Sequence, residues 1–201
     1  NETILSKKCV IFVRFFDPAL VSILKSKGIK VGFDVNIPNI KTDKSINSDS
    51  FNDFNFYIAN NSNHKSEIIK KLKKESKVFV IPHHHVNFNQ DPPNVQKETI
   101  ESIGFIGLKS FLSDNISDIE KFCNERSLNF ICEHPGTREE CIGSLRKLDI
   151  AIACALNKSD TNYQECIENK PNIKICNYQS FGIPTISTPH KSVSEFGDDS
   201  Y

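Results

Sequence analysis

Short apolar runs alternate with segments of helical spacing along the 201-residue chain. The run CVIFVRFF (9–16) has the length and continuity of a strand buried on both faces. The next segment, DPALVSILKSKG (17–28), has an acid at its start, a proline after it and a closing glycine, as is typical of a helix. Strands that alternate with helices in this way predict an α/β fold with parallel sheets.

The alternation occurs in two stretches of similar architecture. The expected strands lie at 9–16, 29–35, 55–60, 78–82, 103–107, 128–134, 149–155 and 183–189, and the main helices at 17–28, 62–76, 113–127, 137–148 and 170–182. Between the stretches, residues 87–102 are polar and contain Pro92-Pro93, which is typical of a linker. We therefore expect an N-terminal unit over 1–86, a linker over 87–102 and a C-terminal unit over 103–201.

Charge and cysteine usage narrow the class of protein. The chain has 25 basic and 25 acidic residues, but the first 90 residues hold 14 basic and 8 acidic ones, which suggests two units with different partners. The seven cysteines are odd in number, form no CxxC pair and lie mostly in apolar runs, as expected of reduced thiols in the cytoplasm. No run reaches the ~18 apolar residues of a membrane span, and no signal peptide opens the chain.

Two partner classes can be weighed from the same composition. No aromatic interleaving or zinc pattern supports nucleic-acid binding, so no nucleic acid is expected. The basic helix 65–77 is compatible with a peripheral contact to anionic lipid or to an acidic acceptor, and equally with a solvated helix face.

The segment NKPNIKICNYQSFGIPTISTP (169–189) carries the strongest local signal for a ligand. Pro171 is expected at the first helical position and Gly182 just past the last. Lys170 and Lys174 would then share a face near the helix N-terminus, where free backbone N–H groups and the helix dipole favour an anion. Two lysines suit a phosphate, and two solvated lysines on an ordinary helix are the alternative.

The sequence KPNIKICNYQSFGIPTIS (170–187) resembles the nucleotide-sugar-binding segment of GT-B glycosyltransferases. IGFIG (103–107) resembles the first strand and glycine turn of that family's C-terminal domain, and LRKLDIAIA (145–153) the helix and strand before the donor segment. The stretch from Asn55 to Phe88 resembles the last helix and strand of the N-terminal domain with the start of the linker. Together the similarity covers residues 9–35 and 55–196.

The resemblance implies two Rossmann-like parallel-sheet units facing a cleft, in an enzyme that transfers a sugar from a nucleotide-sugar donor without metal or cofactor. Lys170 and Lys174 would neutralise the diphosphate leaving group, and Gly107 would let the backbone approach it. The rest of the implied donor-binding set is Asn177, Ser180, Gly182 and Glu195. Glu195 is equally explained as an acid at a helix start.

Two features depart from the family pattern. Many retaining members carry two glutamates eight positions apart around this helix, where the chain has Asn169 and Asn177, so the choice between inversion and retention stays open. No glycine-rich turn precedes the first unit, and the closing helices of the family have no counterpart. We therefore expect a short or truncated form.

An inverting reaction needs a base to deprotonate the acceptor. Asp34, His64 and His84 are the candidates, although an aspartate such as Asp34 is also common at the end of a strand without any catalytic role. In PHHH, the neighbouring His83 and His85 would line the cleft. A metal site on these histidines lacks a third ligand fixed by spacing, so no metal is expected.

The acceptor is left open as a glycan, a lipid or a protein. Two other functions stay in competition with the transferase. One is a non-catalytic Rossmann-like module that binds a nucleotide or regulates, which the missing acidic pair favours. The other is a metal-dependent hydrolase built on the histidines.

Overall fold

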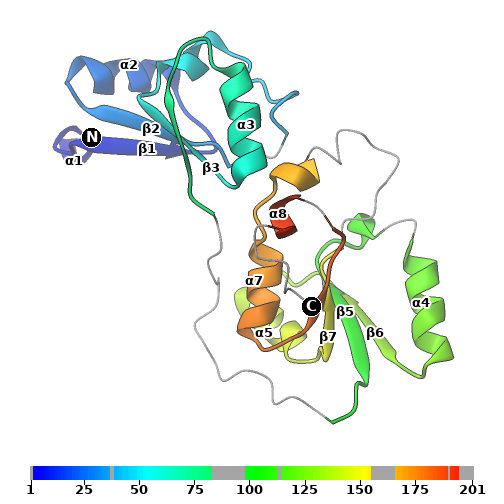
Figure 1. Cartoon of the computed structure of the whole chain (residues 1–201). Helices are drawn as coiled ribbons and strands as arrows, with labels where there is room; N and C mark the ends of the chain where they lie inside the picture. The colour runs from blue at the N-terminus through cyan, green and yellow to red at the C-terminus, as the bar shows by residue number, and fades with distance from the viewer. Residues whose placement is uncertain are drawn as a thin grey trace. The chain divides into compact units, whose positions relative to one another are not determined.

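A computed structural model describes residues 2–36, 39–82, 98–112, 115–154, 166–189 and 191–194. The chain forms two compact units, Asn1–His83 with Glu165–Pro171, and His84–Gln164 with Asn172–Tyr201. Each unit contains a four-stranded sheet in which all neighbouring strands run parallel (Figure 1). The predicted α/β class with two Rossmann-like parallel sheets is confirmed.

The first unit alternates strands and helices in simple succession. Its elements are α1 (Glu2–Leu5), β1 (Cys9–Val13), α2 (Pro18–Ser26), β2 (Lys30–Asp34), η1 (Asp49–Asp53), β3 (Phe56–Ala59), α3 (Ser62–Lys71) and β4 (Lys77–Val80). The strand order in the sheet is β1-β2-β3-β4. Each connection moves one strand further in the same direction, and such connections are right-handed, so α2, η1 and α3 lie on the same face of the sheet.

Aromatic rings fill the core on this helix-covered face. Phe33 of β2 stacks on Phe54 with ring centroids 5.0 Å apart, and Phe51 of η1 packs against Tyr57 of β3 at 5.0 Å. The Tyr57 hydroxyl donates to the Phe51 carbonyl, which satisfies the one polar group of the cluster. Burial raises the pKa of Tyr57, so this hydroxyl stays protonated and keeps donating.

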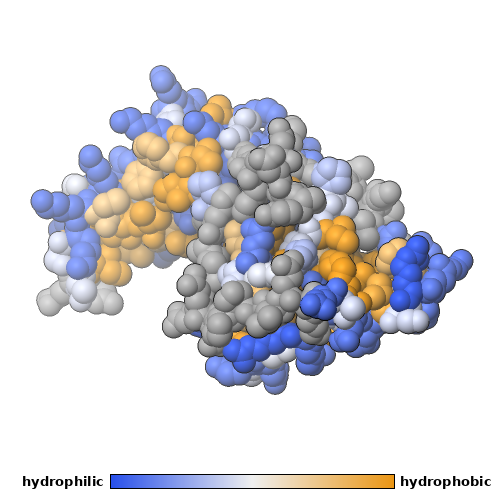
Figure 2. Space-filling model, turned by 60° about the horizontal axis from the view of Figure 1, so that its bottom comes forward, coloured by the Kyte–Doolittle hydropathy of each residue, from blue (hydrophilic) through white to orange (hydrophobic). Residues whose placement is uncertain are grey.

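The opposite face of the first sheet is exposed. Ile11 and Val13 of β1 are 47% and 56% exposed, and Phe79 of β4 is 49% exposed. Figure 2 shows a broad hydrophobic area at its upper left. The prediction that 9–16 is buried on both faces is therefore wrong. β1 is an edge strand, and its alternate residues point away from the face that α2, η1 and α3 cover.

The ends of α2 follow the predicted signals, whereas α3 ends earlier than predicted. Asp17 caps α2 by accepting from Ala19 N–H at 2.9 Å, and Gly28 follows the helix with φ +74°. α3 ends at Lys71, short of the predicted residue 76. Lys73 lies beyond the helix, where its ammonium pairs with Asp49.

The second unit has a sheet whose strand order reverses. Its elements are β5 (Ser102–Ile106), η2 (Lys109–Phe111), α4 (Ile116–Glu125), β6 (Asn129–Glu133), α5 (Arg138–Leu145), β7 (Ile150–Ile152), α7 (Ile173–Ser180), β8 (Thr185–Ile186) and α8 (Lys191–Ser194). The order is β6-β5-β7-β8. The chain moves outward from β5 to β6 and then back past β5 to β7 and β8. A topological switch point therefore lies at the carboxyl end of β5.

Right-handed connections place α4 on one face of this second sheet and α5 and α7 on the other. The two faces accordingly have separate cores. Leu145 of α5 and Tyr178 of α7 belong to one core, and Phe105 of β5 and Cys123 of α4 belong to the other. Among the described residues, no helix has the length and apolar character that crossing a membrane requires.

The one-sided core of the first sheet predicts an asymmetric response to truncation. We expect Phe33→Ala to lower the free energy of unfolding by about 3–5 kcal/mol, because Phe33 is fully buried among aromatic rings. Phe79→Ala, on the exposed face of the same sheet, should cost less than about 1.5 kcal/mol. Urea denaturation measures both, and equal losses would contradict the one-sided core.

Candidate functional site

The structure brings two predicted donor-site residues, Gly107 and Lys174, together at the switch point. Gly107 follows β5 with φ +153°, a conformation that side chains of L residues rarely adopt. The Lys174 ammonium lies 3.8 Å from the centroid of the Phe105 ring and 2.6 Å from where a Cβ at position 107 would stand. A side chain at position 107 would displace the Lys174 ammonium from this place, and the backbone conformation there favours glycine.

A buried hydrogen bond fixes α7 against the same strand end. The hydroxyl of Tyr178, one turn beyond Lys174, accepts from the backbone N–H of Ile106 at 3.0 Å. Tyr178 is only 1% exposed, and this burial raises its pKa. The position of Lys174 is therefore set by a polar contact between its own helix and β5.

The start of α7 differs from the prediction. The helix begins at Ile173 with Asn172 as N-cap, so the prediction that Pro171 occupies the first helical position is wrong. Lys170 precedes the helix, and the four-residue spacing does not put it on one helix face with Lys174. Lys174 is the second residue of α7, where backbone N–H groups and the dipole favour an anion. Gly182 follows the helix with φ +69°, as predicted.

Lys109 is a further cation at this edge that the motif analysis did not single out. Burial raises the pKa of the Cys132 thiol in β6, and the positive charges of Lys109 and Lys174 oppose this rise. Both lysines therefore act on the same point at the end of the sheet. Lys109 also pairs with Glu120 of α4 at 3.7 Å. Its place two residues after Gly107, beyond a predicted strand, was the available signal.

The remaining predicted donor-site residues lie further along α7 or outside the described residues. Asn177 is one turn after Lys174, and the Ser180 hydroxyl donates to the Asn177 carbonyl at 2.7 Å. Glu195 and the three predicted histidines His83, His84 and His85 lie outside the described residues. In the described part of the chain, no group of three His, Cys, Asp or Glu side chains could hold a metal ion.

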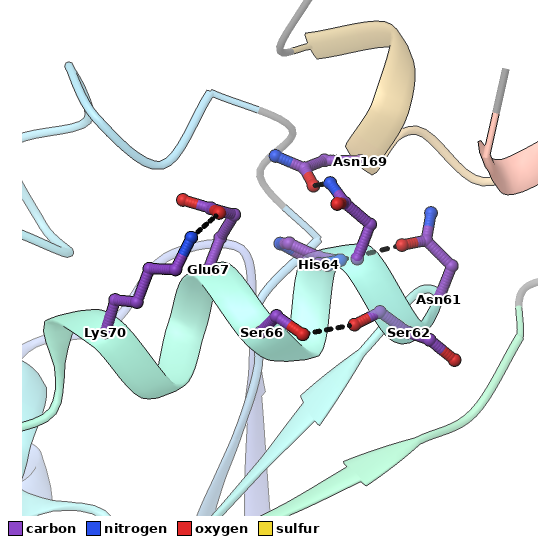
Figure 3. Close-up of polar contacts among 8 residues, drawn as sticks. Asn61, Ser62, His64, Ser66, Glu67, Lys70 and Asn169 are labelled. Carbon is purple, nitrogen blue, oxygen red and sulfur yellow. Dashed lines mark hydrogen bonds and ion pairs between the residues drawn. The ribbon is translucent and has the colours of Figure 1, made fainter.

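His64, a predicted base, is fully buried in the first turn of α3. Its Nδ1 accepts from the backbone N–H of Asn60 at 3.1 Å. The backbone N–H of His64 donates to the Asn61 side-chain oxygen at 2.7 Å (Figure 3). A nitrogen that accepts from an N–H carries a lone pair, so the neutral ring bears its proton on Nε2. The lone pair that a base would use is already engaged by the backbone.

Asp34, a second predicted base, ends β2. Its neighbour Phe33 points into the aromatic core, so the Asp34 side chain points to the opposite face of the sheet. The Asp34 carbonyl accepts from Arg14 N–H at 3.1 Å, and Arg14 has φ +66° in a tight turn that Phe15 N–H closes on Val13 at 2.7 Å. This strained turn, with Phe15 72% exposed beside it, was not predicted.

A row of asparagine amides binds a segment from far along the chain. Asn60 and Asn61 donate through Nδ2 to the carbonyls of Asn169 and Glu168 at 3.3 and 3.1 Å. Asn63 donates to the Asn169 side-chain oxygen at 2.8 Å (Figure 3). Residues Glu165–Pro171 therefore form part of the first compact unit, whereas the sequence places them within 103–201. No local pattern signals contacts between residues over 100 positions apart.

Comparison with known proteins supports the fold assignment. No protein-family model matches the chain, and no curated protein matches it in sequence. Solved structures do match. TarM aligns with 91% of this chain at 13% identity and a TM-score of 0.51, and the galactosyltransferase WaaB of the lipopolysaccharide outer core aligns with 90% at 12% identity and 0.51. The GtfA/B complex aligns with 89% at 11% identity and a TM-score of 0.49.

TarM and WaaB are GT-B glycosyltransferases, so the predicted resemblance is confirmed at the level of the fold. The chain spans 41% of the length of TarM and 56% of that of WaaB. At such low sequence identity, the likeness describes the arrangement of strands and helices rather than an activity.

The close approach of Lys174 to Gly107 predicts a marked cost for any side chain at position 107. We expect Gly107→Ala to lower the free energy of unfolding by about 1–3 kcal/mol, because the new methyl group meets an ammonium and the backbone is strained. Gly143→Ala in α5 is the matched control. It has open space and should stabilise by about 0.5–1 kcal/mol. Equal effects in thermal denaturation would contradict the packing around Lys174.

Proposed function

We propose that the protein is a glycosyltransferase that transfers a sugar from a nucleotide-sugar donor to an acceptor without a metal ion. The observation that carries the proposal is the Lys174 ammonium, which lies against Gly107 at the switch point of a parallel sheet. Ligands of open parallel sheets bind beyond the carboxyl ends of the strands at such points. The fold shared with GT-B glycosyltransferases adds support.

The chemistry of sugar transfer suits a cation at this place. As the bond from the sugar to the nucleotide breaks, negative charge grows on the diphosphate leaving group. Lys174 and the backbone N–H groups at the start of α7 would stabilise this charge, with Lys109 nearby. Lys170 would add a further charge from the segment that precedes the helix. A fixed cation can neutralise a diphosphate as a metal ion otherwise would.

The remaining roles are those that the resemblance to GT-B glycosyltransferases implies. Asn177 and Ser180, in the later turns of α7, and Gly182 after it would complete the donor site with Glu195. The acceptor would be a glycan, a lipid or a protein, and the reaction would take place in the cytoplasm.

Among the candidate bases, the geometry favours Asp34 over His64. The His64 lone pair at Nδ1 is engaged by the Asn60 N–H, whereas Asp34 is a carboxylate at the carboxyl end of its strand. His84 stays a candidate in the same role. The strained turn at Arg14 lies next to Asp34 and would serve acceptor binding, since such turns often occur at functional sites.

A non-catalytic nucleotide-binding module is the second candidate. Asparagines occupy positions 169 and 177, where many retaining GT-B enzymes have glutamates. Such a module would bind the nucleotide through Lys174 but would transfer no sugar.

The proposed donor site predicts that removing the Lys174 side chain weakens nucleotide binding. We expect Lys174→Ala to weaken binding of the preferred nucleoside diphosphate by at least about tenfold, because a charge-assisted contact to phosphate is lost. Isothermal titration with UDP, GDP, ADP and CDP measures the affinity. Lys121→Ala, on the exposed face of α4, is the control and should leave it unchanged. Full affinity in Lys174→Ala would overturn the phosphate assignment.

The proposed base predicts a loss confined to the chemical step. We expect Asp34→Asn to lower kcat by about 10²–10⁴-fold while the affinity for the nucleoside diphosphate stays unchanged. His64→Gln should instead act mainly on stability, because His64 is buried and bonded to the backbone. Release of nucleoside diphosphate in the presence of acceptor measures kcat. If the wild-type protein binds nucleotide but forms no nucleoside diphosphate from the sugar donor, the result would favour the binding module.

A further inference from the structure

The strand end that holds the Lys174 ammonium also holds an aromatic ring. Phe105 of β5 is 1% exposed, and its ring belongs to the core between the second sheet and α4. The ammonium lies 3.8 Å from the centroid of this ring, well inside the ~6 Å range of a cation–π contact. Both residues belong to the second compact unit, so the contact depends on the structure of this unit alone.

Lys174 reaches the ring from the other face of the sheet. Its helix α7 contributes Tyr178 to the core on one face, whereas Phe105 belongs to the core on the opposite face. A Cβ at position 107 would lie 2.6 Å from the Lys174 ammonium and 3.0 Å from Cε1 of Phe105. The lysine side chain therefore passes over the end of β5 at Gly107, and its ammonium lies at the switch point.

The electrostatics of two neighbouring thiols agree with this position. Burial raises the pKa of Cys132, the residue of β6 beside Phe105, and the positive charges of Lys109 and Lys174 oppose the rise. Burial also raises the pKa of Cys141 in α5, and the charge of Lys174 opposes that rise too. Cys132 packs against the core on the α4 face and Cys141 against the core on the α5 face. A charge that acts on thiols of both faces fits a place above the strand end.

An aromatic ring holds a cation in a way that suits the binding of an anion. The face of the ring attracts the ammonium through its quadrupole, yet the ring carries no net charge. A carboxylate in the same place would also attract the ammonium, but its negative charge would repel a phosphate. The Phe105 ring thus fixes the ammonium without adding a negative charge at this edge of the sheet.

We propose that Phe105 is a positioning residue whose ring holds the Lys174 ammonium above the end of β5 for the diphosphate of the donor. The inference rests on the proposed function and adds this residue to it. Phe105 need not touch the ligand, since it acts through Lys174. A lysine side chain that is already held loses less conformational freedom on binding a phosphate than an unrestrained one.

Graded fluorination of the Phe105 ring tests the proposal. Phenylalanine with one, two or three fluorine atoms at position 105 weakens the attraction of the ring face for a cation step by step and changes the shape of the side chain little. The probe is the nucleoside diphosphate that the wild type binds most tightly among UDP, GDP, ADP and CDP. Its affinity, measured by isothermal titration, should fall with each fluorine, by about three- to tenfold in total.

Two controls separate this role from packing. In the Lys174→Met background, the same fluorinated residues should cause no further loss, because the cation is gone. Phe130 of β6 packs against the same core, and its fluorination should leave the affinity unchanged. Melting temperatures identify the variants that stay folded. Without nucleotide, the ring current of Phe105 should shift the Cε protons of Lys174 upfield in NMR spectra, and Phe105→Leu should abolish this shift.

The outcomes separate the two claims. If the wild type binds none of the nucleoside diphosphates, the proposed function is overturned and the role of Phe105 with it. If the wild type binds one of them but fluorination leaves the affinity unchanged or raises it, the role of Phe105 alone is overturned. The same holds if fluorination lowers the affinity equally in the Lys174→Met background, because the ring would then act on structure in general. Lys174 protons without an upfield shift would contradict the ring contact itself.

Discussion

The parallel direction of the strands is the constraint on which the rest of the structure depends. Every carboxyl end in a parallel sheet meets the same edge, so residues that are distant in sequence gather there. In the second sheet this edge holds Gly107, Lys174 and the Tyr178 bond to β5. The ammonium lies against the glycine and over the Phe105 ring, and it is carried by the first turn of α7. A single backbone requirement, the glycine, thus opens the position of a cation.

In the first unit, buried side-chain amides hold together segments that are distant in sequence. Asn60 and Asn61 lie directly after β3, and their side-chain amides donate to the backbone carbonyls of Asn169 and Glu168. The same asparagines engage His64, which makes this histidine part of the scaffold. The polar residues at the end of a strand therefore divide into those that bind the protein itself and those that remain suited to a ligand. Hydrogen-bond partners make this division, and residue type does not.

Much of the fold followed from local patterns. The alternation of strands and helices, the Asp17 cap and the glycines after α2 and α7 were all predicted, because each is set by neighbours in sequence. The burial of β1 was predicted wrongly, since an apolar run does not reveal that its strand lies at the edge of a sheet with helices on one face. The start of α7 was misplaced because Pro171 suits the residues before a helix as well as its first turn. The contacts of Asn169 with Asn60 and Asn63 depend on tertiary structure alone and left no signal in the sequence.

Recognition of a diphosphate at the start of α7 is the central claim, and one comparison tests it most directly. Isothermal titration of the wild-type protein with a nucleoside diphosphate and with the monophosphate of the same base isolates the contribution of the second phosphate. For the preferred nucleobase, the structure predicts that the nucleoside diphosphate binds at least about tenfold more tightly than the monophosphate. The reason is that Lys174 and Lys109 place positive charge at this edge of the sheet. Equal affinities for the two nucleotides, or no binding of any diphosphate, would contradict it.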